Sequence, residues 1–124
     1  MQLAFWCVLA MGVMPVATVA IAKWRGLDNH APRDWAQSID GYRRRAYAAH
    51  LNHFEAFPLF AAAVLVAATQ GAPMTTVNAL AAAVVLARVA YTACYVADAA
   101  TLRSLVWGAG WVLTLAIFVL PALS

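Results

Sequence analysis

Four long apolar segments dominate this chain of 124 residues and leave little else from which to build a fold. They run over about residues 3–22, 47–68, 74–97 and 102–120. Each supplies the roughly 20 residues that a helix rising 1.5 Å per residue needs to cross a hydrocarbon core of about 30 Å. Hydrophobic residues make up 65% of the chain and charged residues 10%, whereas an ordinary soluble domain is about half apolar and about a quarter charged. The sequence therefore predicts an all-α integral membrane protein, a four-helix bundle.

The first apolar segment could be mistaken for a secretory signal peptide, since VATVAIA at its end resembles a cleavage region. Residues 1–14 carry no Lys or Arg, so the basic start of a signal peptide is missing. We therefore expect a retained helix over about residues 2–24, bent near Pro15. The other helices are expected over about residues 42–70, 74–97 and 101–121, with Thr101 as the N-cap of the last. Residues 1–124 are expected to form a single transmembrane domain.

The charged loop residues are concentrated on one side of the predicted membrane. Those between the first two apolar segments are Lys23, Arg25, Arg33, Arg43, Arg44 and Arg45, with Asp28, Asp34 and Asp40 among them. The uncharged turn Gly71-Ala72-Pro73 joins the second and third segments as an antiparallel hairpin. Since Lys and Arg accumulate in cytoplasmic loops, we expect the charged loop to be cytoplasmic and both termini to lie on the other side. A nucleic-acid surface would need basic residues spread over a soluble fold, which is excluded here.

Polar residues inside the apolar segments indicate a site, because ionisable groups within a membrane are costly and usually functional. The second segment carries Arg45, Asn52 and Glu55, the third carries Arg88, Tyr91 and Tyr95, and Arg103 and Ser104 open the fourth. Within the second and third helices these spacings keep each set on one face. We expect the three sets to line one pocket in the cytoplasmic half of the bundle.

Glu55 and Arg88 are expected at the same depth in the membrane. Glu55 lies ten residues beyond Arg45, and Arg88 lies nine residues before Ala97, where the third segment ends on the same side. We expect the two charges to meet inside the bundle, directly or through a bound ligand. A structural ion pair is the alternative reading of these two residues. The other polar groups nearby exceed what one ion pair requires, and the cationic ones favour an anionic ligand.

Histidines and cysteines do not indicate a metal site or a disulfide. His50 and His53 are three residues apart, but His53 and Glu55 point about 160° apart on a helix, so one helix cannot direct all three to a metal. Both histidines are interpreted as interfacial. Cys7 and Cys94 lie within apolar segments and are interpreted as buried small hydrophobes.

Three stretches of the chain carry a resemblance to a known family. They are RAYAAHLNHFEAFPLF (residues 45–60), the preceding LDNHAPRDW (27–35), and ARVAYTACY (87–95) followed by LRS (102–104). Together they resemble the MAPEG family, the membrane-associated proteins of eicosanoid and glutathione metabolism, and the small size is similar to that of bacterial members. The resemblance implies a homotrimer of four-helix subunits. For a bacterial member we expect the inner membrane, where the distribution of Lys and Arg makes both termini periplasmic. The resemblance also implies glutathione bound between neighbouring subunits near the cytoplasmic face.

The resemblance also assigns roles to the polar residues. It implies that Arg103 stabilises the thiolate, with Ser104 beside it. It also implies glutathione contacts for Asn52, Glu55, Arg88 and Tyr95. We add Arg45 and Tyr91 to this binding set because they lie on the same helix faces. A thiol is a poor nucleophile until its anion is favoured, and a nearby guanidinium favours it. The expected function is a membrane-bound, glutathione-dependent transferase or peroxidase-like enzyme acting on lipophilic electrophiles.

Two departures from the family pattern leave an alternative open. Ala48 stands where characterised enzymes commonly place an arginine, four residues before Asn52, and Trp107 or Gly108 replaces a tyrosine that follows the counterpart of Arg103. Both changes remove contacts to a thiol ligand. The alternative is a MAPEG-fold membrane protein without glutathione chemistry, acting as a lipid-binding or structural subunit, so catalysis itself stays open. A transporter is disfavoured because no pair of helices is broken by Gly or Pro.

Overall fold

The computed structural model describes all 124 residues and contains helices and turns but no strand. The four long helices are α1 (Leu3–Lys23), α3 (Gly41–Thr69), α4 (Met74–Val96) and α5 (Ala100–Val119), with a short helix α2 (Pro32–Ser38) and a final 3₁₀ turn, Leu120–Ala122. All four long helices are long and apolar enough to cross a membrane. The prediction of an all-helical chain with four membrane-spanning helices is confirmed.

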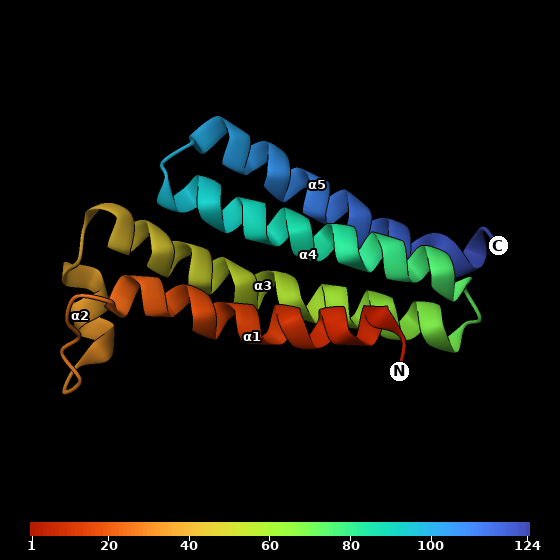
Figure 1. Cartoon of the computed structure of the whole chain (residues 1–124), viewed down its shortest axis with the longest axis horizontal. Coiled ribbons are helices and arrows are strands. Elements are labelled where there is room, and N and C mark those ends of the chain that lie inside the picture. The colour runs from red at the N-terminus through yellow and green to blue at the C-terminus, as the bar shows by residue number, and fades with distance from the viewer.

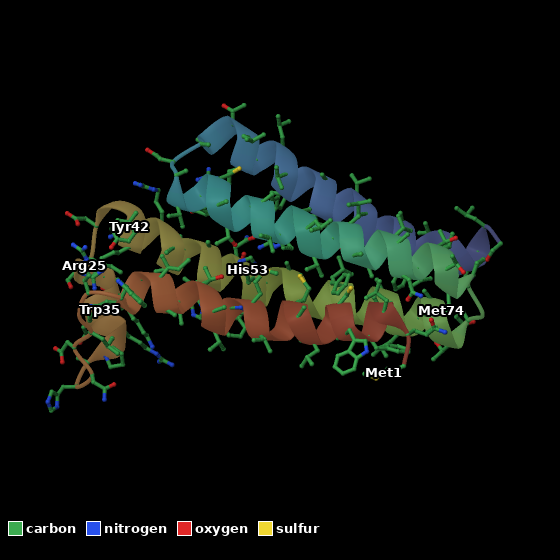
Figure 2. The ribbon with its side chains drawn as sticks, in the orientation of Figure 1. Met1, Arg25, Trp35, Tyr42, His53 and Met74 are labelled. Carbon is green, nitrogen blue, oxygen red and sulfur yellow. The ribbon has the colours of Figure 1, made fainter.

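The long helices form two antiparallel pairs, α1 along α3 and α4 along α5 (Figure 1). The pairs meet where α4 contacts both α1 and α3 and where α5 contacts α3. Both termini and the α3–α4 turn lie at one end of the bundle, and α2 and the α4–α5 turn lie at the other (Figure 1). The side chains of Arg25, Trp35 and Tyr42 gather at this second end, while Met1 and Met74 lie at the first (Figure 2). The charged connections therefore share one end of the bundle.

The α3–α4 and α4–α5 turns each contain one residue with left-handed backbone. In the α3–α4 turn Gly71 has φ +79°, and the N–H of Ala72 donates to the carbonyl of Ala67, which closes the last turn of α3. In the α4–α5 turn Asp98 has φ +62°, and the N–H of Ala99 donates to the carbonyl of Cys94. The chain therefore reverses direction within a few residues at each turn, without a longer loop.

The expected N-cap at Thr101 is wrong. Helix α5 begins at Ala100 with Ala99 as its N-cap, and no side chain caps this end. The physical reason is the left-handed Asp98, which redirects the chain early enough for the carbonyl of Ala99 to accept the first helical hydrogen bond, from Arg103. Thr101 therefore lies inside the first turn.

Two arginines at the start of α3, Arg43 and Arg45, bind backbone carbonyls at the charged end of the bundle. Arg43 donates through Nε to Ala22 O (2.8 Å) and through Nη2 to Gly26 O (2.6 Å), which terminates α1. Arg45 donates through Nε and Nη2 to Val96 O (3.2 and 3.0 Å), which terminates α4. Cations are favourable at the negative end of a helix, so these side chains tie the ends of α1 and α4 to α3.

Small residues dominate the interior of the bundle. The fully enclosed positions include Ala4, Ala63, Ala67 and Ala81, with Met11, Phe60, Val64 and Ile117 as the larger side chains. Alanine lets helix backbones approach closely, which is the usual packing in membranes. Only 24 of 124 residues are buried, and many large apolar side chains, such as Trp6, Leu86 and Val112, are exposed, as they would be toward lipid.

Candidate functional site

The site is built around Arg88 of α4, which is only 3% exposed although it lies inside a membrane-length helix. Its Nη2 donates to Asn52 Oδ1 and contacts His53 Nδ1, both at 2.9 Å, and its Nε donates to the same ring nitrogen at 3.2 Å. No enclosed side-chain nitrogen or oxygen in the bundle lacks a partner. A buried guanidinium is tolerated when its N–H groups are paired in this way, so α3 supplies the groups that hold Arg88.

Glu55 reaches Arg88 through Asn52 rather than directly. Asn52 Nδ2 donates to Glu55 Oε2 at 2.9 Å while its Oδ1 accepts from Arg88. Asn52 precedes Glu55 by one helical turn, and its side chain occupies the space between the two charges. Glu55 itself is exposed on the outer face of α3. The two charges were expected to meet directly or through a bound ligand; in the structure the amide of Asn52 links them.

His53 lies in the cluster around Arg88, whereas the sequence predicted an interfacial histidine. It is 0% exposed and contacts Thr92 Oγ1 of α4 through Nε2 at 2.8 Å, and it lies in the middle of the bundle rather than at an interface (Figure 2). The sequence carries no signal for this, because Glu55 was expected inside the bundle. Since Glu55 in fact faces outward, a residue about 160° away on the same helix faces the interior.

His50, one turn before His53 on α3, faces α1. It is half-buried, and its Nδ1 donates to the carbonyl of Pro15 in α1 at 2.7 Å. The chain brings no three His, Cys, Asp or Glu side chains together as metal ligands. Cys7 is buried, Cys94 is half-buried, and both are free thiols.

Two tyrosines of α4 connect Arg88 to α5. The guanidinium of Arg88 lies 4.3 Å from the centre of the Tyr91 ring, and that of Arg103 lies 4.4 Å from the centre of the Tyr95 ring. The two rings meet edge to face with centroids 5.5 Å apart. Cations are attracted to aromatic faces, so the sequence-predicted residues of α4 and α5 form one continuous stack.

Arg103 lies in the first turn of α5 and is half-buried. Its side chain has no hydrogen-bond or ion-pair partner in the chain, and no acidic residue shares its helical turn. A cation near the positive end of a helix is unfavourable, so both the guanidinium and the helix end favour an anion here. Ser104 is exposed, and its hydroxyl donates to Ala100 O at 3.1 Å.

Arg45 lies apart from the Arg88 cluster, at the charged end of the bundle. Its Nε and Nη2 groups both donate to Val96 O, as described above. Ala48, one turn further along α3, has no polar atom to extend the cluster toward that end. The structure thus brings together Asn52, Glu55, Arg88, Tyr91, Tyr95 and Arg103. Arg45 is not part of this group, and Ser104 is exposed and contacts only Ala100 O.

An apolar cavity adjoins Arg88 on the side away from the charged end. It is lined by Met11, Ala56, Leu59, Val84, Arg88, Gly110, Trp111 and Thr114, which come from all four long helices. A polar cluster therefore borders directly on an apolar one within the membrane-spanning part of the chain.

Four membrane-spanning helices that hold a paired, buried arginine and a free one define an integral membrane protein with an internal charged site. The family model described as the MAPEG family matches residues 3–123, nearly the whole sequence, and the chain belongs to this family. The family includes glutathione-dependent transferases and peroxidases, so the resemblance seen in the sequence is confirmed. No curated protein and no solved structure matches the chain.

Proposed function

We propose that the protein is a membrane-bound, glutathione-dependent transferase or peroxidase-like enzyme that acts on lipophilic electrophiles. The observation that carries the proposal is the stack of Arg88, Tyr91, Tyr95 and Arg103, which holds two guanidinium groups beside an exposed carboxylate, Glu55. Glutathione carries two carboxylates, one ammonium group and a thiol. Its charges thus match in number and sign what this face of the bundle offers.

In the proposed site Arg88, Asn52 and Glu55 bind the polar parts of glutathione. The Nη1 group of Arg88 has two N–H donors and no acceptor within the chain, so it can bind a carboxylate. Glu55 accepts one hydrogen bond at Oε2 from Asn52, which leaves Oε1 for an ammonium group. Tyr91 and Tyr95 contribute ring faces and hydroxyl groups along the same wall.

Arg103 stabilises the thiolate in this proposal. When the thiol loses its proton to water, the negative sulfur is stabilised by the unpaired guanidinium and by the amino end of α5. The sulfur lone pair then forms a bond to an electrophilic carbon of the lipophilic substrate, whose leaving group departs with its electron pair. Ser104 can donate to the sulfur only by turning its hydroxyl away from Ala100 O.

A homotrimer is part of the proposal. Exposed Glu55 would face lipid in an isolated subunit, and a charge at the centre of a membrane helix costs roughly 2.5–3.5 kcal/mol on insertion scales. A neighbouring subunit packed on this face of α3 would remove that cost and close the glutathione site. We further propose that residues 1–124 form one transmembrane domain of the bacterial inner membrane, with α2 cytoplasmic and both termini periplasmic.

One observation favours the alternative, a family member without glutathione chemistry that binds lipid or serves as a structural subunit. Arg45, which would extend the anion site toward the charged end, has both its Nε and Nη2 groups on Val96 O. Ala48 offers no substitute, and Trp107 is 41% exposed on the outside of α5. At the charged end, the proposed site therefore offers fewer contacts to glutathione than the family pattern would.

Calorimetry with glutathione in detergent tests the proposal, followed by ultraviolet absorbance of the thiolate. We expect wild type to bind glutathione and to form its thiolate near neutral pH. In Arg103→Leu we expect the turnover of a lipophilic electrophile to fall at least tenfold, about 1.4 kcal/mol, and the affinity for glutathione to fall less than that. Arg33→Leu, an exposed arginine on α2, is the matched control. Absence of binding to wild type would favour the alternative, and full activity of Arg103→Leu would exclude the assigned role.

A further inference from the structure

Hydrogen-bond chemistry fixes the protonation of buried His53. Thr92 Oγ1 donates its only proton to the carbonyl oxygen of Arg88 at 3.1 Å, since a carbonyl can only accept. Thr92 Oγ1 therefore accepts from His53 Nε2 at 2.8 Å, and Nε2 carries a proton. At the other side of the ring Arg88 can only donate, so His53 Nδ1 is unprotonated. His53 is the neutral Nε2–H tautomer.

The same contacts fix the orientation of the Arg88 guanidinium. Its Nε–Nη2 edge is occupied by His53 Nδ1 and Asn52 Oδ1, and the Tyr91 ring lies against its face at 4.3 Å. Only Nη1 has no acceptor. Because every enclosed side-chain nitrogen has a partner, Nη1 is not completely enclosed, although Arg88 as a whole is only 3% exposed.

We propose that His53 is a positioning residue, held as the neutral Nε2–H tautomer by Thr92, which orients Arg88 so that its Nη1 edge is free for an anionic group of the ligand. The identity of that ligand as glutathione rests on the proposed function. The tautomer and the orientation of Arg88 do not depend on it.

The energetic advantage lies in preorganisation. An arginine side chain that is immobilised only on binding loses rotamer freedom at that step, which lowers the affinity. His53 and Asn52 hold Arg88 before the ligand arrives, so this cost falls on folding rather than on binding. A protonated His53 would place a donor against the donors of Arg88, which explains why the Thr92 contact matters for the site.

Nitrogen NMR of protein labelled with ¹⁵N-histidine tests the tautomer without any ligand. The chain has three histidines, and His53→Asn identifies the His53 resonances. We expect an unprotonated Nδ1 and a protonated Nε2 at neutral pH in wild type and in Thr92→Ser, which keeps the hydroxyl. In Thr92→Val, which removes the acceptor of the Nε2 proton, the His53 nitrogen resonances are expected to differ from those of wild type. A protonated Nδ1 or an imidazolium in wild type would overturn the proposal.

Exchange of the Arg88 Nε proton and calorimetry with reduced glutathione test the positioning role. We expect slow exchange in wild type and in His53→Asn, whose amide oxygen can replace Nδ1 as acceptor, and fast exchange in His53→Leu. Glutathione affinity should fall about tenfold in His53→Leu and about threefold or less in His53→Asn. His50→Leu is the matched control, because it removes a histidine that contacts Pro15 rather than Arg88.

The outcomes separate this inference from the proposed function. Binding that is lost equally in His53→Leu and His53→Asn, or unchanged in both, would refute the positioning role. If wild type does not bind glutathione, the proposed function fails, and the exchange rates of the Arg88 Nε proton still decide whether His53 orients Arg88. If His53→Leu does not fold, the exchange rates of the Arg88 Nε proton in Thr92→Val and Thr92→Ser decide whether His53 orients Arg88.

Discussion

Replacing Asn52 by alanine should destabilise the bundle more than any other loss of a single amide side chain. Asn52 makes two hydrogen bonds to charged groups, with Arg88 Nη2 and with Glu55 Oε2, each at 2.9 Å. Hydrogen bonds to charged groups contribute about 1.5–3 kcal/mol, and the exposed Glu55 contributes little of this. Because His53 still holds the Nε side of Arg88, we expect a loss of about 2 kcal/mol in the free energy of unfolding.

Asn78 provides the matched control. It also joins two helices, accepting from the N–H of Ala4 at 2.9 Å and donating to Gln2 Oε1 at 3.1 Å, but both partners are neutral. Hydrogen bonds between membrane helices contribute about 0.6 kcal/mol on average. Unfolding in detergent mixtures with increasing dodecyl sulfate, followed by circular dichroism, gives both values. A loss in Asn52→Ala no larger than in Asn78→Ala would refute the reasoning.

A double-mutant cycle tests whether Asn52 carries the interaction between Glu55 and Arg88. We expect Glu55→Gln and Arg88→Leu to be non-additive in wild type, because removing one partner leaves the other charge uncompensated. In the Asn52→Ala background the two effects should become additive. Coupling that survives without Asn52 would mean that the two charges interact by another route.

Three further outcomes follow from the helix ends and contacts. Arg45→Leu should speed amide hydrogen exchange in the last turn of α4, because two donors to Val96 O are lost; an unchanged rate in that turn would contradict the capping role. Gly110→Leu should lower thermal stability in detergent more than Gly108→Leu, since a Cβ at Gly110 already lies 3.9 Å from Arg88 Cδ while a Cβ at Gly108 meets nothing within 4 Å; equal losses would place α5 further from α4. A cysteine at His30, with the native cysteines replaced, should resist impermeant reagents added to intact cells, and labelling there would reverse the proposed topology.

Composition and apolar length were sufficient to predict the four spanning helices. Continuous apolar segments of about 20 residues have the length of spanning helices, and a helix pairs its backbone polar groups within its own segment, as lipid requires. The same local rules placed Arg88, Tyr91 and Tyr95 on one face of α4, and the ring contacts agree with this. The short helix α2 was not predicted, since seven residues beginning with proline give no periodic apolar pattern.

Helical spacing could compare the depth of Glu55 and Arg88 but not the direction in which each side chain points. The structure turns Glu55 outward and His53 inward. Asn52 therefore links Glu55 to Arg88, and the histidine that was expected at an interface contacts the arginine. Which face of α3 is interior depends on where α1 and α4 pack against it. Sequence determines the faces of each helix through the period of 3.6 residues, whereas only the packing of helices against each other decides which face becomes the site.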